Sequence, residues 1–280
     1  MKYNLIADSG ATKTSWCLSI EGQLHQQYNS QGISPIYQSP KEIEEYIHRS
    51  VYPMFENKEI KAIYFYGTGC IPEKEEMMKS AIQRSFKVET IHIYSDLIAA
   101  VHALCGNQPG IACIMGTGSN SCEWDGEKIV KQISPLGFIL GDEGSGADLG
   151  KRLVNNALKD QLPKEIKEAF LEEYKLTQNI IIDKVYKQPF PSRFLASLSP
   201  FLLKNIEVPE IRNIVTTSFT EFFEKNVMQY NYQNNKVNFV GSIAYYYKDI
   251  LLEAAAQKSI EIGTIYKSPI EGLIEFYKDK

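Results

Sequence analysis

The chain has 280 residues, of which 44% are hydrophobic and 23% charged, a composition typical of a globular protein rather than a disordered or fibrous one. At this length one large lobe or two smaller lobes are expected. The formal net charge of −4 offers no basic field for a nucleic-acid backbone, and no apolar run approaches the roughly 18 residues of a membrane span, so we expect neither partner.

Cysteine and histidine usage indicates the compartment. The five cysteines include no CxxC pair and the four histidines lack HExxH spacing, which disfavours structural zinc and a disulfide scaffold. The amino-terminal segment reaches Asp8 before an apolar signal region develops. We therefore expect a cytoplasmic protein.

The first part of the chain predicts a mixed α/β lobe. Apolar runs bounded by turn residues predict strands over 3–7, 15–20, 24–28, 62–66 and 90–94. Helical periodicity is expected over 40–55 and 73–86 and from Ser95 through Leu104, with Ser39 and Ser95 as N-caps. This order predicts a mixed sheet with an antiparallel hairpin edge and helices on its faces.

The pattern then restarts with a strand over 110–115 and another glycine turn. Aligned on their glycines, Gly10 and Gly118 are each followed six residues later by a tryptophan, Trp16 and Trp124, which suggests a duplicated strand-turn-strand unit. A helical stretch (145–226), a strand (237–240) and helices (243–258 and 269–277) are expected next, the last returning to the first lobe. The prediction is an α/β fold with two lobes, 1–108 plus 267–280 and 109–266, around an interlobe cleft.

The turn from Asp8 to Thr14 combines a carboxylate, Gly10, Lys13 and two hydroxyls in one hairpin. Gly10 permits a positive φ, so successive N–H groups can point at one anion, to which Thr12 and Thr14 can donate hydroxyls. Asp8 can hold Mg²⁺ through water. The alternative is a plain polar hairpin turn.

The second turn, Gly116-Thr117-Gly118-Ser119, repeats this chemistry without a carboxylate. Two glycines and two hydroxyls suit close approach to a phosphate, and together the two turns favour nucleotide binding over ordinary turns. Neither is a GxxxxGK[ST] phosphate loop or a GxGxxG dinucleotide motif.

Asp96 follows the strand over 90–94 and lies in the first turn of a helix, whose dipole favours the charged carboxylate. If this strand ends at the cleft, Asp96 can take a proton from an alcohol that attacks a γ-phosphoryl group. The alternative is an acid that only complements the dipole.

The stretch from Leu136 to Gly146 is rich in glycine and carries two adjacent acids before a helix. Asp142 and Glu143 are good acceptors for vicinal hydroxyls, and Gly137 belongs to the same candidate substrate site. A helix-entry loop with dipole-complementing acids is the alternative. Gly241-Ser242, after the strand over 237–240, is a weaker candidate that would let a nucleotide base pack on the following helix.

These motifs resemble those of the N-acetylglucosamine kinase-type members of the BadF-type ATPase family, in the actin, sugar-kinase and heat-shock-chaperone ATPase superfamily. They are Asp8–Thr14, Ser95-Asp96, Gly116–Ser119, Gly141–Ser145 and Val240–Ser242. The resemblance implies two ribonuclease-H-like lobes with ATP, Mg²⁺ and sugar in the cleft. It also implies that Asp96 is the catalytic base and a sugar ligand, that Asp142 holds sugar hydroxyls, and that Thr12 and Thr117 lie at the phosphates.

This sequence departs from the family at two positions. Where relatives carry an asparagine for the sugar, it has Ser34 or Pro35, so Ser34 is the expected substrate contact. Leu136 replaces a tryptophan that family members can carry before the acidic turn.

The resemblance implies an ATP-dependent kinase acting on the 6-hydroxyl of an N-acetylated amino sugar, foremost N-acetylglucosamine. We expect the amino sugar and ATP as partners, with a homodimer as a possible assembly. Two alternatives remain: an ATPase that activates a redox partner, and a sensing module that binds nucleotide or sugar without transfer.

Overall fold

The computed structural model describes residues 2–10 and 13–279, so Thr12 of the first turn lies outside the described residues. The chain divides into two compact units: unit 1 is Met1–Gly106 with Ser268–Lys280, and unit 2 is Asn107–Lys267. The described residues form two five-stranded mixed sheets, one in each unit, with flanking helices. The expected α/β fold class is confirmed.

The sheet of unit 1 has the strand order β3-β2-β1-β4-β5. Its β1 pairs antiparallel with β2 and parallel with β4, and β4 pairs parallel with β5. The elements of unit 1 are β1 (Tyr3–Ser9), β2 (Lys13–Ile20), β3 (Gln23–Gln31), α1 (Pro40–Tyr46), η1 (Ile47–Val51), η2 (Tyr52–Met54), β4 (Ile60–Gly67), α2 (Pro72–Phe86), β5 (Thr90–Ser95), α3 (Asp96–Leu104) and α13 (Ile270–Phe276).

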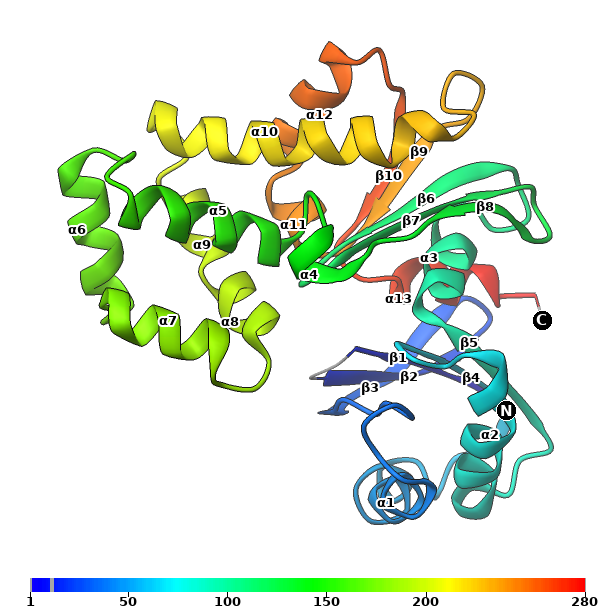
Figure 1. Ribbon diagram of the computed structural model, residues 1–280. Coiled ribbons are helices and arrows are strands. Elements are labelled where there is room, and N and C mark those ends of the chain that lie inside the picture. The colour runs from blue at the N-terminus through cyan, green and yellow to red at the C-terminus, as the bar shows by residue number, and fades with distance from the viewer. Residues whose placement is uncertain (1, 11–12, 280) are drawn as a thin grey trace. The chain divides into compact units, whose positions relative to one another are not determined.

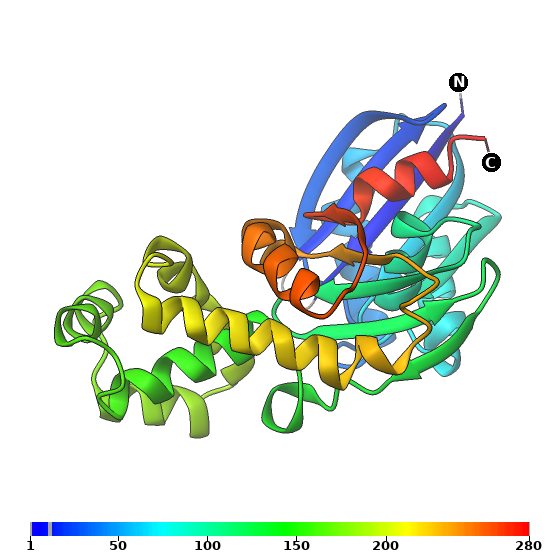
Figure 2. The ribbon, with the colours of Figure 1, turned by 90° about the horizontal axis from the view of Figure 1, so that it is seen from above.

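Helices cover both faces of this sheet (Figure 1). On one face, Leu5 and Phe65 of the strands pack with Ile43 of α1 and Met78 of α2. On the other face α3 and α13 lie side by side, and Figure 2 shows α13, in red, running along the blue strands. Leu273 of α13 is fully buried there. Because α13 returns from the far end of the sequence, it completes the core that the first 106 residues begin.

The helix expected over 40–55 begins as expected but does not continue as a regular α-helix. Ser39 caps α1 in a full capping box with Glu42, as the sequence indicates. After Tyr46 the chain widens into a π-turn, in which the Tyr52 amide donates to the Ile47 carbonyl, and then tightens into a 3₁₀ turn at Pro53. Proline has no N–H to donate, so the regular bonding pattern cannot continue through it.

Unit 2 has the strand order β10-β9-β6-β7-β8. Its elements are β6 (Gly110–Met115), β7 (Ser119–Trp124), β8 (Ile129–Ile133), α4 (Gly137–Leu140), α5 (Gly146–Leu158), α6 (Lys164–Glu173), α7 (Gln178–Tyr186), α8 (Pro191–Ser197), α9 (Ser199–Lys204), α10 (Pro209–Lys225), η3 (Val227–Gln229), β9 (Val237–Val240), α11 (Ser242–Tyr246), α12 (Lys248–Gln257) and β10 (Ile262–Tyr266).

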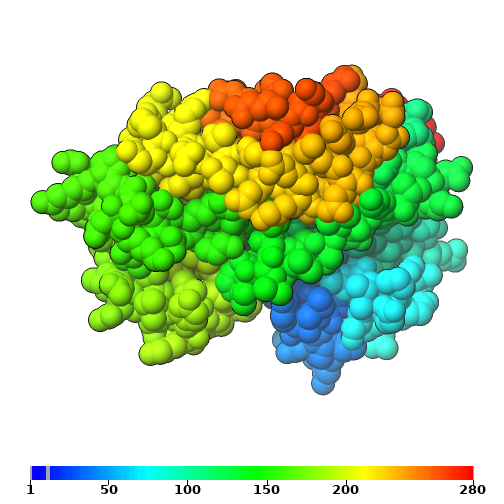
Figure 3. Space-filling model, turned by 45° about the horizontal axis from the view of Figure 1, so that its top comes forward, coloured from blue at the N-terminus to red at the C-terminus, as the bar shows by residue number. Residues whose placement is uncertain are grey.

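One large apolar cluster holds unit 2 together. It joins the inner residues of β6 and β9, such as Ile111 and Phe239, to Leu153 of α5, Phe222 of α10 and Leu251 of α12. In the space-filling view α10 (yellow) and α12 (orange) lie next to each other on the surface (Figure 3). The helical insertion therefore shares its core with the sheet.

The two sheets repeat one topology. Read from the hairpin outward, β3-β2-β1-β4-β5 corresponds to β8-β7-β6-β9-β10, which confirms the duplicated strand-turn-strand unit. The tryptophan alignment that suggested it is wrong, however. Trp16 pairs with Ala7 near the turn, whereas Trp124 pairs with Gly110 at the opposite end of β6.

Two strands and a second helix break were also not expected. The strands β8 and β10 lie at sheet edges, and their side chains are largely exposed or half-buried, so neither has the apolar run of an inner strand. The helix expected over 243–258 is interrupted at Tyr247, which is buried and donates its hydroxyl to the Ser199 carbonyl. Among the helices that the structure describes, none combines the length and apolarity needed to span a membrane.

Candidate functional site

Three parallel strands of unit 1 end side by side and place the candidate residues at one edge. In the register, Asp8 of β1 is opposite Tyr66 of β4, and Gly67 is opposite Ser95 of β5. The carboxyl ends of parallel strands are where α/β sheets bind ligands. Asp8, Ser34, Thr68 and Asp96 meet here, and we call them the unit 1 cluster.

Asp96 is the first residue of α3, directly after the N-cap Ser95, whose hydroxyl accepts the Ile98 amide at 3.3 Å. This position confirms the expected helix start, and the helix dipole favours the charged carboxylate there. The Thr68 hydroxyl donates to Asp96 Oδ2 at 2.8 Å. The carboxylate is therefore both partly exposed and held in one orientation.

Asp8 is the second carboxylate of this cluster. The pKa of Asp8 is raised to about 7, first by burial and then by the negative charge of Asp96, while Lys13 opposes the shift. Two carboxylates close enough to repel each other make this edge of the sheet favourable for a cation.

The turn after Asp8 differs from the expectation for Gly10. The Gly10 amide donates to the Lys13 carbonyl at 2.9 Å, and the φ of Gly10 lies outside the positive range that the sequence suggested. The turn is closed by this hydrogen bond without a left-handed residue at Gly10. Lys13, at the other end of this turn, is exposed to solvent.

The Thr14 hydroxyl takes part in hydrogen bonds inside unit 1. It is fully buried, its hydroxyl donates to the Gln31 carbonyl at 3.0 Å, and it lies 2.7 Å from the Ser9 hydroxyl. The Ser9 hydroxyl in turn bonds both backbone groups of Ile33. Thr14 thus braces the start of the segment that leads to Ser34, and a ligand does not reach its hydroxyl in this arrangement.

Ser34 joins the unit 1 cluster through Thr68. It is buried, its amide donates to Gln38 Oε1 at 2.8 Å, and its hydroxyl donates to the Thr68 carbonyl at 3.3 Å. The following Ile36 and Tyr37 are exposed. Thr68 was not among the expected site residues, because a threonine in a Gly-Thr-Gly turn is also typical of a plain strand end.

In unit 2, the turn from Gly116 to Gly118 is bonded to the start of α5. The Gly116 carbonyl accepts the Gly146 amide at 2.8 Å, and the Thr117 carbonyl accepts the Ala147 amide at 3.0 Å. The first amides of a helix lack partners within the helix, and here the turn supplies them. The turn and α5 are therefore fixed to each other.

Asp142 lies directly against this turn. Its Oδ1 accepts the Ser119 amide at 3.3 Å, and a Cβ added at Gly118 would lie 3.1 Å from its Oδ2, closer than most real contacts. Burial raises the pKa of Asp142, the Ser119 amide opposes the shift, and the charge of Glu143 adds to it. The predicted sugar-binding acid and the predicted phosphate turn are thus one cluster.

Gly241 completes that cluster. Its φ is 130°, which favours glycine, and a Cβ there would lie 2.1 Å from the Met115 carbonyl oxygen. The turn that leads through Ser242 into α11 therefore packs on the end of β6, next to Gly116. We call Gly116–Ser119, Asp142 and Gly241 the unit 2 cluster.

The carboxylate of Glu143, the second predicted sugar-binding acid, takes part in a salt bridge. Its carboxylate lies 3.1 Å from Lys225 Nζ at the end of α10, and Lys225 also pairs with Glu221 at 2.7 Å. Glu221 continues to Arg152, which pairs with the buried Asp148 at 2.8 Å. This chain of charges ties the acidic turn to α5 and α10. The pairs Asp148/Arg152 and Glu221/Lys225 are each four residues apart on one helix, a spacing that indicates ion pairs from sequence, whereas the bridges between the helices have no such signal.

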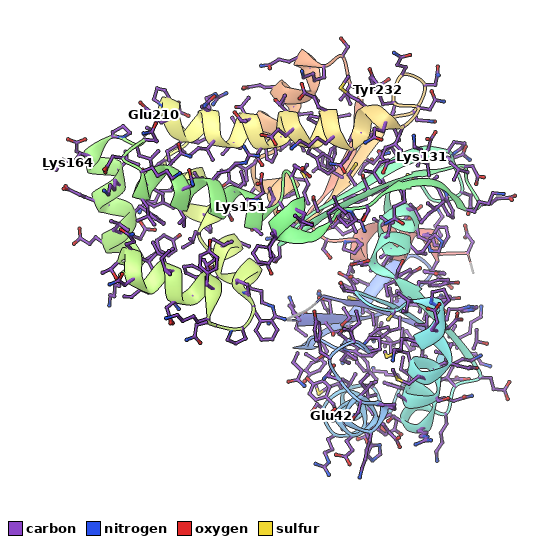
Figure 4. The ribbon with its side chains drawn as sticks, viewed as in Figure 1. Glu42, Lys131, Lys151, Lys164, Glu210 and Tyr232 are labelled. Atoms are coloured by element: carbon purple, nitrogen blue, oxygen red, sulfur yellow. The ribbon has the colours of Figure 1, made fainter. Side chains whose placement is uncertain are left out.

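Gly137 begins α4 in an exposed position. Its φ is 75°, nothing lies within 4 Å of an added Cβ, and Ile139 and Leu140 beside it are mostly exposed. The Lys151 ammonium group on α5 donates to the Phe138 carbonyl at 3.1 Å, and Figure 4 shows Lys151 beside α4. The contacts above do not bring Gly137 into the unit 2 cluster.

Comparison with solved structures finds proteins that match the chain over nearly its whole length. A Porphyromonas gingivalis protein described as a putative N-acetylglucosamine kinase shares 42% identity over 100% of this chain and 99% of that chain, with a TM-score of 0.96. A Chromobacterium violaceum protein with the same description shares 17% identity over 99% of both chains, with a TM-score of 0.75. A ROK family glucokinase from Streptomyces griseus, in complex with glucose and AMPPNP, shares 12% identity over 98% of this chain and 97% of that chain, with a TM-score of 0.61.

The last two comparisons show the fold alone, because their identities are low. No protein-family model matches the sequence, and no curated protein matches it.

Proposed function

The chain belongs to the sugar-kinase family that includes the Porphyromonas gingivalis protein, and from that premise we propose that it phosphorylates an amino sugar with ATP. The proposed reaction transfers the γ-phosphoryl group to the 6-hydroxyl of an N-acetylated amino sugar, with N-acetylglucosamine as the preferred acceptor. Within the sugar kinases, the motifs favour the BadF-type branch.

The observation that carries the proposal is the position of Asp96. A general base must combine accessibility with a fixed orientation, and Asp96 has a partly exposed carboxylate that the Thr68 hydroxyl holds at 2.8 Å. In the proposed step, Asp96 takes the proton of the 6-hydroxyl while that oxygen attacks the γ-phosphorus and ADP leaves. The proton on Asp96 then passes to solvent.

The residues of the unit 1 cluster suit a magnesium ion brought in with the nucleotide. Within the described ranges no group of three or more His, Cys, Asp or Glu side chains could hold a metal ion. Mg²⁺ at kinase sites is usually held by one or two carboxylates together with substrate phosphates. Asp8, beside Asp96 at the ends of the parallel strands, would supply such a carboxylate, and a bound cation would favour its ionised form against the burial that raises its pKa. The ion would neutralise phosphate charge during transfer.

We assign the phosphate contacts to Gly10, Thr12 and Lys13 in unit 1 and to Gly116–Ser119 in unit 2. Gly241 and Ser242 are the proposed contacts for the adenosine part. Thr14 is left out of this set, because its buried hydroxyl already bonds to Gln31.

For the sugar we propose Ser34, Asp96 and Asp142. Gly137 stays a prediction from the sequence, because in the described part of unit 2 the structure gives it no contact with Asp142. Glu143 is better explained as a brace for the acidic turn through its salt bridge to Lys225.

The test of the base is Asp96→Asn, measured by coupled ADP release and by calorimetric sugar binding. We expect sugar affinity to stay within a few-fold and kcat to fall about 10²- to 10⁴-fold, the usual contribution of a general base. Asp249→Asn is the matched control, since Asp249 also lies in the first turn of a helix but is exposed on α12. Unchanged turnover in Asp96→Asn would remove Asp96 from the mechanism.

A panel of acceptors tests the substrate class. N-acetylglucosamine, N-acetylmuramate, glucosamine and glucose are compared, and a 6-deoxy analogue is expected to bind without accepting phosphate. ADP release that does not depend on sugar would favour an ATPase, and binding of ATP and sugar without ADP release would favour a sensing module.

A further inference from the structure

The turn after β4 contains a threonine that no motif singled out. Gly67 and Gly69 flank Thr68, and a side chain at either position would require a neighbouring side chain to move. A Cβ at Gly67 would lie 3.0 Å from the Phe65 ring, and one at Gly69, whose φ is 86°, would lie 2.6 Å from Ile36. The Cys70 amide closes the turn on the Gly67 carbonyl at 3.1 Å. The backbone of Thr68 is therefore fixed by its neighbours.

Every polar group of Thr68 contacts a different part of the unit 1 cluster. Its amide donates to the Ser9 carbonyl at 3.1 Å, at the end of β1 beside Asp8. Its carbonyl accepts the Ser34 hydroxyl at 3.3 Å. Its hydroxyl donates to Asp96 Oδ2 at 2.8 Å. One residue thus links the end of β1, the segment after β3 and the start of α3.

We propose that Thr68 is a positioning residue that fixes the Asp96 carboxylate for proton transfer, an inference that rests on the proposed role of Asp96. Rotation about the last side-chain bond of an aspartate is soft, so an unassisted carboxylate samples a broad range of orientations. A β-branched threonine is stiff at χ1, and a hydrogen bond from it selects one orientation. Oδ2 is held by Thr68, which leaves Oδ1 as the oxygen that would take the proton.

If Thr68 only stabilised the turn, loss of its hydroxyl would lower the stability of the fold rather than the rate of the chemical step. Thr68 is exposed, so loss of its hydroxyl leaves no buried cavity, and its backbone bonds to Ser9 and Ser34 do not need the side chain. A positioning role lowers the rate of the chemical step with little change in binding or folding.

The test compares Thr68→Val with Thr68→Ser. Valine keeps the shape of the side chain without the donor, and a hydrogen bond to a charged group accounts for an expected loss of about 10- to 100-fold in kcat. The KM for sugar and the melting temperature should change little. Thr68→Ser restores the donor and should recover most of the turnover. The control is Thr177→Val, which removes the exposed N-cap hydroxyl of α7 and should leave kcat unchanged.

A double variant separates this inference from the proposed function. In an Asp96→Asn background, Thr68→Val should lower kcat no further, because its effect passes through the carboxylate. If Thr68→Val keeps full turnover while Asp96→Asn loses it, Thr68 is not a positioning residue and the base assignment stands. If Thr68→Val changes only the melting temperature, or if Thr68→Ser fails to recover turnover, the inference is also overturned. Full turnover in Asp96→Asn would instead defeat the base assignment itself.

Discussion

Asp8 carries a carboxyl whose pKa is raised to about 7 by burial and by the charge of Asp96, against the opposing effect of Lys13. Its ordinary value is 3.8, so the unfolded chain gives up this proton at lower pH than the folded chain does. The stability that Asp8 contributes is therefore complete below about pH 4 and is lost as the pH rises through 7. At neutral pH the raised pKa of Asp8 therefore lowers the free energy of unfolding of the free protein, and a cation bound at the carboxylate would offset this loss.

Asp8→Asn should accordingly stabilise the free protein at high pH. In urea unfolding without nucleotide and with a chelator, the free energy of unfolding should exceed that of the unmodified protein by more than about 1 kcal/mol at about pH 8, because one unit of pKa shift corresponds to about 1.4 kcal/mol. The advantage should shrink towards about pH 4. An equal effect at both ends of this range would contradict the raised pKa.

Asp125→Asn serves as a control of opposite sign. Backbone amides of Lys128 and Glu127 lower the pKa of Asp125, so its contribution to stability is present above its ordinary pKa and is lost on acidification. This variant should therefore be less stable than the unmodified protein near neutral pH, and the difference should close as the pH falls.

Residue patterns located some members of the two clusters and missed others. Asp8 and Asp96 could be proposed because each follows an apolar strand, and the structure brings them close enough for the charge of Asp96 to raise the pKa of Asp8. Thr68 could not be recognised, since a hydroxyl in a turn looks the same whether or not it reaches a carboxylate. The salt bridge of Glu143 was hidden because Lys225 lies far along the chain.

At the scale of elements, α10 supports the acidic turn through Ser218. This fully buried serine accepts the Gly144 amide at 3.1 Å and donates to Asp148 Oδ2 at 2.7 Å. Asp148, itself 2% exposed, lies in the first turn of α5 and also pairs with Arg152. The Ser218 hydroxyl thus links the acidic turn, α5 and α10 through hydrogen bonds.

Ser218→Ala should destabilise unit 2 by roughly 2–4 kcal/mol, because it leaves a buried amide and a buried carboxylate each short of a partner. Urea unfolding at neutral pH measures this change. Ser197→Ala, which removes an exposed hydroxyl bonded to Phe194, should cost less than about 0.5 kcal/mol. Equal losses in the two variants would mean that the buried centre contributes no more than a surface serine.

Element prediction succeeded where both faces or one face of a strand is buried. The inner strands β1, β4, β6 and β9 have long buried runs and were all expected. The edge strands β8 and β10 have no such run, and their pairing depends on neighbours that are distant in sequence. Because β8 and β10 could not be predicted, the sequence did not indicate that the two sheets have the same strand order.

At the scale of the molecule, unit 1 is discontinuous in sequence. Leu273 and Ile274 of α13 are buried against the sheet face that carries Tyr64 and Tyr66, and the Tyr277 and Tyr66 hydroxyls lie 2.5 Å apart. Unit 2 is contiguous and has its own core. The stability of each unit can therefore be changed separately.

Leu273→Ala should lower the free energy of unfolding of unit 1 by about 2–5 kcal/mol, the usual cost of truncating a buried leucine. Hydrogen exchange should show faster exchange in β1, β4 and β5, with little change in β6 and β9. Glu271→Ala, on the exposed side of the same helix, is the control and should leave both sets unchanged. Uniformly faster exchange in all these strands would show that the two units unfold as one.

The discontinuity of unit 1 also orders events during synthesis. Domains tend to fold as they leave the ribosome. Here the whole of unit 2 is translated before α13 emerges, so the contiguous second unit can reach its final fold while the first 106 residues still lack their closing helix. Until then α3 alone covers the sheet face against which α13 packs, and the apolar surface that receives Leu273 is open. In the nascent chain, the apolar surface that Leu273 will cover therefore stays open to solvent until the last helix has been made.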